Sequence, residues 1–377
     1  MSSRPSQLPH WIEIGVLPIL NILMALAVAG LILWVIGANP FSAVAILIDG
    51  AFGSGYGWGY TLYYATSFIF TGLAVAVAFH AGLFNIGGEG QAVIGGLGAG
   101  LVALAFDHHL PSVVLLPLAI AASAVFGAAW AMVPGYLQAY RGSHIVITTI
   151  MFNFLAAALM VYLLVDVFRD PGQMSTQSRT FEESATLPEI ARLFGWFGIT
   201  IPSTPLNLSF IWALICCVLV EMFIWRSRLG YELRATGLSP RAAIYAGIKP
   251  ARIVLIAMAV SGALAGFVGV NEILGVQHRL LLEFVAGAGF TGIAVALMGR
   301  NHPFGIVLAS ILFGALYQGG AELAFEIPTI TREMIITIQG LIILFSGALA
   351  YMNRPWVERL YLYLASNRPG GEAPTHG

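Results

Sequence analysis

Residues 145–165 read IVITTIMFNFLAAALMVYLLV, a run in which no side chain is charged. A helix needs about 20 apolar residues to cross the hydrocarbon of a bilayer, and this run has that length. The whole chain has the same character. Of 377 residues, 58% are hydrophobic and only 9% are charged, whereas a soluble domain has roughly 25% charged residues. The sequence therefore predicts an all-α polytopic membrane protein.

Ten segments approach the length of a membrane span, and we expect about ten transmembrane helices. Only the sixth contains a charged residue, Glu221 near its end, so no span is expected to carry a central acid or base. The third and eighth segments are short and rich in glycine. The predicted spans are 17–37, 61–79, 90–106, 112–133, 145–165, 208–225, 253–270, 284–299, 303–321 and 334–352.

The basic residues orient these spans, because cytoplasmic connections of membrane proteins are enriched in Lys and Arg. With a cytoplasmic N-terminus, five basic residues fall outside: Arg169, Arg179, Arg192, Arg279 and Arg332. Twelve fall inside: Arg4, Arg141, Arg226, Arg228, Arg234, Arg241, Lys249, Arg252, Arg300, Arg354, Arg359 and Arg368. We therefore expect a multi-pass protein of the inner or plasma membrane with both termini in the cytoplasm.

This topology divides the chain into three parts. Residues 1–16 form a cytoplasmic N-terminal segment, residues 17–353 the transmembrane domain, and residues 354–377 a cytoplasmic tail whose Pro/Gly-rich end is expected to be disordered. Two connections are long. The external loop 166–207 is polar and is expected to form an ordered lid or a docking surface for a partner, and the cytoplasmic loop 226–252 holds six of the seventeen basic residues.

Several chemistries are excluded or disfavoured. The balance of 17 basic and 18 acidic residues gives no basic face for nucleic acid. Cys216 and Cys217 are adjacent in an apolar run and have no ligand spacing for a metal. The G-x-G-x-x-G match at 287–292 lies in a predicted span without a preceding strand. A Walker A motif is impossible, because the only lysine is Lys249. We expect no cofactor, no metal and no catalytic residue.

The cytoplasmic loop contains a short capped helix. Ser239 is a good N-cap, Pro240 suits the first helical position, and Gly247 ends the helix. Small residues such as Ala242 and Ala243 permit close approach by a partner, and Tyr245 is able to fill a pocket in it. This pattern favours a docking helix; an ordinary basic loop that only obeys topology is the alternative.

A second pattern, GLFNIGGEGQ at 82–91, predicts a break between the second and third spans. Gly87 and Gly88 permit backbone geometry that other residues resist. Irregular backbone at membrane depth survives only in protein or beside a water-filled cavity. Asn85, Glu89 and Gln91 supply polar groups, and Asn153 lies within the fifth span. These side chains either contact a solute, line its exit, or bond the broken helix ends; the sequence favours the last.

Two further stretches share a pattern. Phe70-Thr-Gly-Leu-Ala-Val-Ala-Val77 and Phe290-Thr-Gly-Ile-Ala-Val-Ala-Leu297 agree at six of eight positions. The agreement indicates either duplicated halves, which are common in transporters, or chance similarity between helices rich in Gly and Ala.

Three stretches together resemble one family, the permease subunits of ATP-binding cassette (ABC) importers for nucleosides and simple sugars, which are distantly related to branched-chain amino-acid permeases. The resemblance covers nearly all of 15–353. The stretches are GLFNIGGEGQ at 82–91, LRATGLSPRAAIYAGI at 233–248 and GFTGIAVALMGRNHPFG at 289–305.

The resemblance implies a type II-like importer architecture in which 237–248 is the coupling helix, seated on a separate cytoplasmic ATPase. Ser239 stands where the family often has Asn, and both residues cap well. Further implied partners are a second, non-identical permease and an extracytoplasmic substrate-binding lipoprotein. The implied ATPase-coupling residues are Gly237, Ser239, Pro240, Ala242, Ala243, Tyr245, Ala246 and Gly247.

The predicted function is therefore that of a non-catalytic subunit forming half of a pathway for a small polar solute, first a nucleoside. A simple sugar or a branched-chain amino acid is the alternative. An ion-gradient-driven secondary transporter is disfavoured, because it would need titrating groups inside the spans.

Overall fold

The computed structural model describes residues 9, 12, 16–35, 37, 39–169, 172, 174–196, 198, 200–327, 330, 332–343, 355–359 and 361. All regular structure in this part of the chain is helical, with two isolated β-bridges, Gln177–Leu281 and Glu189–Asn207. The chain forms two compact units. One is Leu47–Gly319, and the other combines Met1–Ile46 with Gly320–Gly377.

The smaller unit contains α1 (Leu17–Val35) and α14 (Arg332–Ile343). Two helices have residues in both units, α2 (Pro40–Phe52) and α13 (Pro303–Glu326). The larger unit contains α3 (Gly55–His80), α4 (Gly88–Phe106), α5 (Ser112–Arg141), α6 (Ile145–Tyr162), α7 (Ile190–Trp196), α8 (Ser209–Glu221), α9 (Arg228–Leu238), α10 (Pro240–Tyr245), α11 (Pro250–Gly266) and α12 (Ala288–Met298).

Four short segments, labelled η, complete the larger unit. Three are π-helical and continue α6, α8 and α11, and one is a 3-10 turn in the loop after α6. They are η2 (Leu163–Val167), η3 (Glu183–Ala185), η4 (Met222–Arg226) and η5 (Val270–Gln277).

Seven helices among the described residues are long and apolar enough to cross a membrane, which confirms an all-helical, multi-pass chain. Two apolar helices are shorter, α2 and α12. The seven are Gly55–His80, Gly88–Phe106, Ser112–Arg141, Ile145–Val167, Ser209–Arg226, Pro250–Gln277 and Pro303–Glu326.

Several predicted spans have other limits in the structure, and the fourth, at 112–133, continues to Arg141. The eighth, at 284–299, contains a helix only from Ala288 to Met298, because Ala286 and Gly287 have left-handed backbone conformations that interrupt it. At 1.5 Å per residue this helix is about 16 Å long, half a membrane. The seventh continues beyond 270 to Gln277. Residues 344–352 of the tenth predicted span lie outside the described residues.

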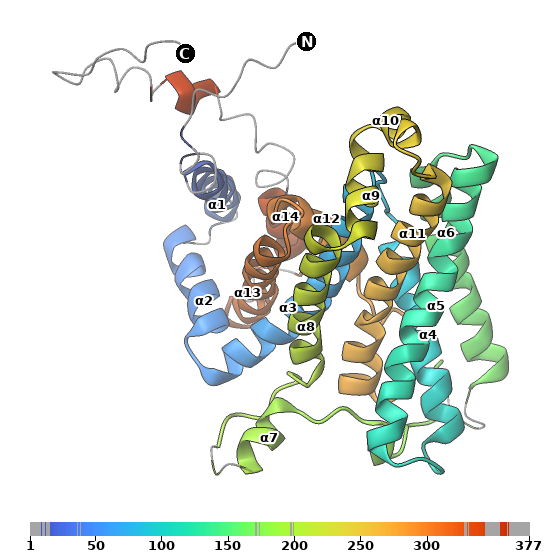
Figure 1. Ribbon diagram of the computed structural model, residues 1–377. Coiled ribbons are helices and arrows are strands. Elements are labelled where there is room, and N and C mark those ends of the chain that lie inside the picture. Colours follow the sequence, from blue (N-terminus) through green and yellow to red (C-terminus); the bar gives the residue numbers. More distant parts are fainter. Residues whose placement is uncertain are drawn as a thin grey trace. The chain divides into compact units, whose positions relative to one another are not determined.

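The core of the larger unit is α3, which packs against α11 and α12, while α11 packs against α4 and α5 (Figure 1). Small residues allow these helices to approach closely. A Cβ added to Gly95 of α4 would lie 2.2 Å from the Cα of Gly266 on α11, and one on Gly262 would lie 2.3 Å from the carbonyl oxygen of Gly127 on α5. Helices α10 and α7 lie at opposite ends of this unit (Figure 1).

Candidate functional site

The first helix break lies between α3 and α4. The chain is irregular from Gly82 to Gly87, and Asn85, which is almost fully buried, holds it. The Asn85 amide nitrogen donates to Gln91 Oε1 and to Ser261 Oγ, both at 2.9 Å. Its oxygen accepts from the Gly87 N–H at 2.9 Å and from Gln91 Nε2 at 3.1 Å. Asn85 and Gln91 therefore satisfy each other and the broken backbone, as the sequence favoured.

Asn153 of α6 completes this first break. Its oxygen accepts from the Gly90 N–H in the first turn of α4 at 2.9 Å, and its nitrogen donates to the Ile86 carbonyl at 3.0 Å. The N-cap residue of α4, Gly87, has no side chain to do this. The amide of Asn153 therefore caps α4 from a neighbouring helix.

The second break precedes α12. The chain leaves η5 with His278 in a left-handed conformation, and it is irregular from there to Gly287, the N-cap of α12. Glu89 in the first turn of α4 caps this second helix. Its carboxylate accepts from the N–H groups of Gly287 at 2.9 Å and Gly289 at 2.8 Å. An acidic group at a helix N-terminus is favoured by the orphan N–H donors and by the helix dipole.

The N-termini of α4 and α12 meet in direct backbone contact. A Cβ on Gly289 would lie 2.2 Å from the Glu89 nitrogen, so only glycine fits there. Helix ends are polar, and inside a membrane protein they require protein partners or a wet cavity. The sequence indicated the first break but not the second, whose cap comes from a residue 198 positions away from Gly287.

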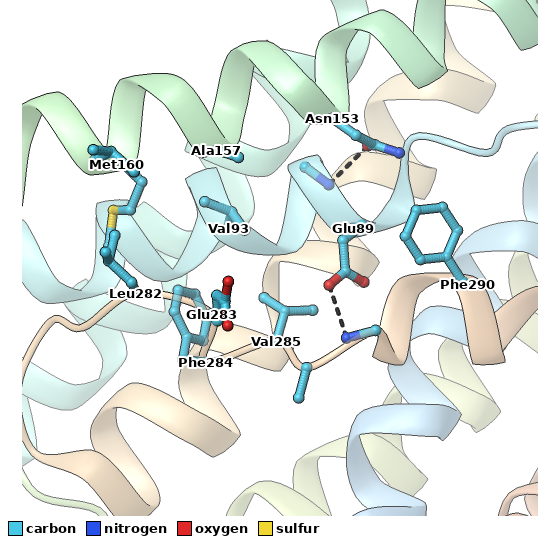
Figure 2. Close-up of a pocket in the computed structure, with 14 residues that line it drawn as sticks. Glu89, Val93, Asn153, Ala157, Met160, Leu282, Glu283, Phe284, Val285 and Phe290 are labelled. Atoms are coloured by element: carbon cyan, nitrogen blue, oxygen red, sulfur yellow. Dashed lines mark hydrogen bonds between the residues drawn. The ribbon is translucent and has the colours of Figure 1, made fainter. Parts of the chain in front are cut away.

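A cavity of about 460 Å³ opens at this meeting point, within the range of small-molecule sites. In Figure 2 the Glu89 carboxylate points to the turn before α12, while Asn153 and Phe290 flank it. The residues that line the cavity come from α4 (Glu89, Gly90, Val93), α6 (Asn153, Ala157, Met160, Val161), the turn 282–287 and α12 (Phe290).

Two of the three polar side chains that line this cavity are carboxylates, which accept hydrogen bonds when ionised. Two carboxylates line it, Glu89 and the exposed Glu283, together with the Asn153 amide. The residues that line the cavity include no Lys, Arg or His. The remaining surface is apolar and includes the aromatic rings of Phe284 and Phe290. Such a lining repels anions and suits a neutral solute that donates hydroxyl hydrogens.

The loop after α6 is hydrogen-bonded to the chain that leads from η5 to the second break. Ser178, Phe181 and Leu187 donate backbone N–H groups to the carbonyls of Leu280 (2.9 Å), His278 (2.7 Å) and Leu274 (2.9 Å), respectively. The same loop is tied to the far end of α4, where Ser184 Oγ donates to the Asp107 carbonyl at 2.5 Å. We call residues 174–190 the lid segment. The predicted external loop 166–207 is thus ordered over this part by hydrogen bonds.

Asp107 is the main anchor of the lid segment. Arg179 donates to both of its carboxylate oxygens, at 2.7 and 2.8 Å, and the Glu182 N–H donates at 3.1 Å. Burial alone would raise the pKa of Asp107, but the Arg179 hydrogen bonds and charge, with the Glu182 N–H, outweigh it and hold the pKa below its ordinary value.

Glu272 is an acid that the sequence analysis missed. It lies in η5, is 8% exposed, and accepts from Tyr63 at 2.6 Å and Ser67 at 3.0 Å, both on α3. Neighbouring Asn271 accepts from Ser209 of α8 at 2.7 Å. Glu272 lies beyond the predicted end of the seventh span at 270 and close to the end of the helix at Gln277, so it is not a central acid. The Asn271-Glu272 pair directly after an apolar run was the available signal.

The capped helix is present as α10, Pro240–Tyr245. Ser239 Oγ accepts from the Ala242 N–H at 3.4 Å, and Gly247 has a φ of 80°. Tyr245 is 95% exposed, and Ala242, Ala246 and Gly247 are also exposed. Ala243, by contrast, is only 2% exposed. Its methyl group packs inside the loop, so it is not on the face open to a partner. Gly237, at the end of α9, packs against the backbone of 80–82, which leads into the first break.

Comparison with known proteins identifies the family of this chain. Residues 57–346 match the family described as branched-chain amino acid transport system / permease component. The chain belongs to this family. Permeases of this family are multi-pass subunits of ABC importers; a separate ATPase hydrolyses ATP, and a substrate-binding partner delivers the solute.

Three relatives of this permease cover most of its length. It is 35% identical to the glucose ABC transporter permease protein of Haloferax volcanii over 97% of this chain and 94% of the relative. It is 36% identical to the guanosine ABC transporter permease protein of Bacillus subtilis over 89% and 94%. It is 32% identical to a nucleoside ABC transporter permease protein of Lactococcus lactis over 87% and 89%.

Proposed function

We propose that this ABC importer permease forms half of a pathway for nucleosides and that the cavity at the two helix breaks is where the solute passes. The observation that carries the proposal is the lining itself, with two carboxylates, an amide, aromatic rings and no basic side chain. A nucleoside is neutral, has ribose hydroxyls to donate, and has a flat base that suits aromatic neighbours.

Glu89 is suited to receive those hydroxyls. An ionised carboxylate has about four lone-pair sites. Two are used by the N–H groups of Gly287 and Gly289, so acceptor sites remain for a solute. Because Glu89 also holds α12, a solute that binds it contacts the group that fixes the second break. Weak, replaceable contacts of this kind suit a pathway that must also release.

The other solute classes fit less well. A branched-chain amino acid carries a carboxylate, and the lining offers no cation to receive one. A hexose has the required hydroxyls, and a glucose permease is among the relatives, so a simple sugar is the second candidate. The guanosine and nucleoside permeases favour the nucleoside.

For the topology, we propose ten crossings with both termini and α10 in the cytoplasm and the lid segment outside. The half-membrane helix α12 and the irregular turn before it would then share one crossing. The lid segment would meet the substrate-binding lipoprotein, and a second, non-identical permease would supply the other half of the path. The basic residues around α10 support this orientation.

We propose further that α10 is the coupling helix, with Gly237, Ser239, Pro240, Ala242, Ala243, Tyr245, Ala246 and Gly247 shaping it. The burial of Ala243 supports a packing role for it, and the exposure of Tyr245 supports that ring as the proposed contact with the ATPase. Tyr245→Ala should abolish co-purification of the ATPase. Tyr231→Ala, at an exposed position on α9, is the matched control. Normal ATPase binding by the Tyr245 variant would refute the assignment.

The solute assignment is tested in proteoliposomes that contain this chain with its ATPase, second permease and binding protein. ATP-driven uptake of labelled guanosine should be inhibited by excess unlabelled nucleosides and not by leucine. If glucose uptake exceeds guanosine uptake, the solute is a simple sugar and the nucleoside assignment is wrong. Uptake that needs no ATP and stops with an uncoupler would contradict the importer mechanism.

A further inference from the structure

A column of tyrosine rings lies on one face of α3. Tyr56, Tyr60 and Tyr64 are spaced four residues apart, so they share that face. Their ring centroids are 4.6 Å apart between Tyr56 and Tyr60 and 6.5 Å apart between Tyr60 and Tyr64. Tyr317 of α13 continues the column, 5.7 Å from Tyr64. We call these four residues the tyrosine column.

The tyrosine column is partly accessible along its length. Tyr56 is 46% exposed, and Tyr60, Tyr64 and Tyr317 are half-buried, whereas the neighbouring residues Ala65 and Ile69 are fully buried. From Tyr56 to Tyr64 the helix rises by about 12 Å.

The column ends beside the cavity. The hydroxyls of Tyr317 and Thr291 lie 3.3 Å apart, and Thr291 follows Phe290, which lines the cavity and is 50% exposed. The tyrosine column and the cavity therefore contact α12 at adjacent residues, Thr291 and Phe290.

We propose that the tyrosine column is a stacking surface that receives the base of a nucleoside on its way to the cavity. The inference rests on the proposed nucleoside pathway. Every purine or pyrimidine presents a flat π-face, and aromatic side chains bind bases through it with little regard to their identity. The column therefore selects for a planar aromatic ring, while Glu89 in the cavity selects for hydroxyls.

Uridine and 5,6-dihydrouridine test this directly, because they share the ribose and differ in the aromaticity of the base. Uptake is measured with Tyr64→Leu, which removes the ring, and Tyr64→Phe, which keeps it. Each rate is divided by the wild-type rate for the same solute, so the selectivity of the binding protein cancels. Tyr136→Leu, in the stacked and exposed Tyr136–Tyr140 pair of α5, is the matched control.

We expect Tyr64→Leu to lower uridine uptake about fivefold to tenfold and dihydrouridine uptake less than about twofold. Tyr64→Phe and Tyr136→Leu should stay near wild type for both. Equal losses for the two solutes in Tyr64→Leu would overturn the proposal and assign the column to packing or to contact with the second permease. No loss for either would also overturn it. If wild-type protein imports neither nucleoside, the proposed function itself fails, and the column proposal falls with it.

Discussion

The breaks before α4 and α12 share one backbone design and differ in their caps. Both helices begin after a glycine N-cap, and in both a side chain from another helix accepts the orphan N–H groups. The cap of α4 is the neutral amide of Asn153, supported by the Asn85–Gln91 pair. The cap of α12 is the carboxylate of Glu89, at the wall of the cavity. The break before α4 is therefore held by buried protein groups, whereas the carboxylate that caps α12 is accessible from the cavity.

Removing the charged cap should have the largest effect. Glu89→Ala leaves the N–H groups of Gly287 and Gly289 without an acceptor, at roughly 1–3 kcal/mol for each buried donor, so we expect uptake to fall about 30-fold or more. Reconstituted transport measures this. Glu283→Gln, which changes the other carboxylate of the cavity but removes no cap, should lose far less. Equal losses of uptake in the two variants would contradict the claim that transport depends on the capping of α12 by Glu89.

The contact between the N-termini of α4 and α12 predicts that two neighbouring glycines tolerate substitution by alanine differently. A Cβ at Gly289 would lie 2.2 Å from the Glu89 nitrogen, whereas one at Gly88 has its nearest neighbour at 3.5 Å. Gly289→Ala should therefore lower the melting temperature by several degrees, as expected for about 2 kcal/mol of overpacking, and Gly88→Ala should not. Thermal unfolding of the detergent-solubilised protein measures both. An unchanged melting temperature for Gly289→Ala would contradict the direct backbone contact between α4 and α12.

A substitution in the break before α4, which is held by uncharged side chains, should lower the stability of the protein more than its transport rate. Asn85→Ala removes hydrogen bonds to Gln91, Ser261 and Gly87, and it should lower stability by about 1–3 kcal/mol. Uptake per folded molecule should stay within about twofold of wild type, because Asn85 does not line the cavity. Uptake normalised to folded protein checks this. A loss of transport without a change in melting temperature would contradict a purely structural role for Asn85.

The smallest expected effect concerns the lid segment, which ties α4 to the chain before the second break. Arg179→Met removes the partner of Asp107 and should speed hydrogen exchange of residues 178–187 at pH 7. Arg192→Met breaks only an exposed pair with Glu183 and is the control. Equal exchange in the two variants would contradict the anchoring role.

The pH dependence of this anchor follows from the lowered pKa of Asp107. A carboxyl whose folded pKa is depressed stabilises the folded state above its unfolded pKa of about 3.9. The contribution is lost as the pH falls through the depressed value. The anchor should therefore be unchanged from about pH 5 to 8 and weaken only in stronger acid. Exchange of residues 178–187 as a function of pH measures this.

Much of the fold could be read from local patterns. The run 145–165, the Ser239-Pro240 cap and the glycines at 87 and 88 each specify a local conformation, and the structure has a helix, a capped helix and a break at these places. The similar stretches 70–77 and 290–297 pack against each other, since a Cβ on Gly292 would meet Thr71. Whether they descend from a duplication stays a prediction.

The rest depends on tertiary contacts that no window of sequence contains. Glu89 caps a helix 198 residues away, so its second role is invisible locally. The shortness of α12 follows from left-handed backbone at Ala286 and Gly287, although the sequence there remains apolar. Glu272 is tolerated in a span because Tyr63 and Ser67 of α3 donate to it. The inward direction of Ala243 depends on how α10 packs on its own loop.

The central claim is that the solute shares Glu89 with the N-terminus of α12. The most direct test compares ATP-driven uptake of guanosine and 2′,3′-dideoxyguanosine by wild-type protein and by Glu89→Gln, with the binding protein saturated by each solute. Because each variant rate is divided by the wild-type rate for the same solute, the preference of the binding protein cancels. We expect the substitution to lower guanosine uptake about tenfold more than dideoxyguanosine uptake, because guanosine loses the partner of its ribose hydroxyls. An equal loss for both solutes would contradict it.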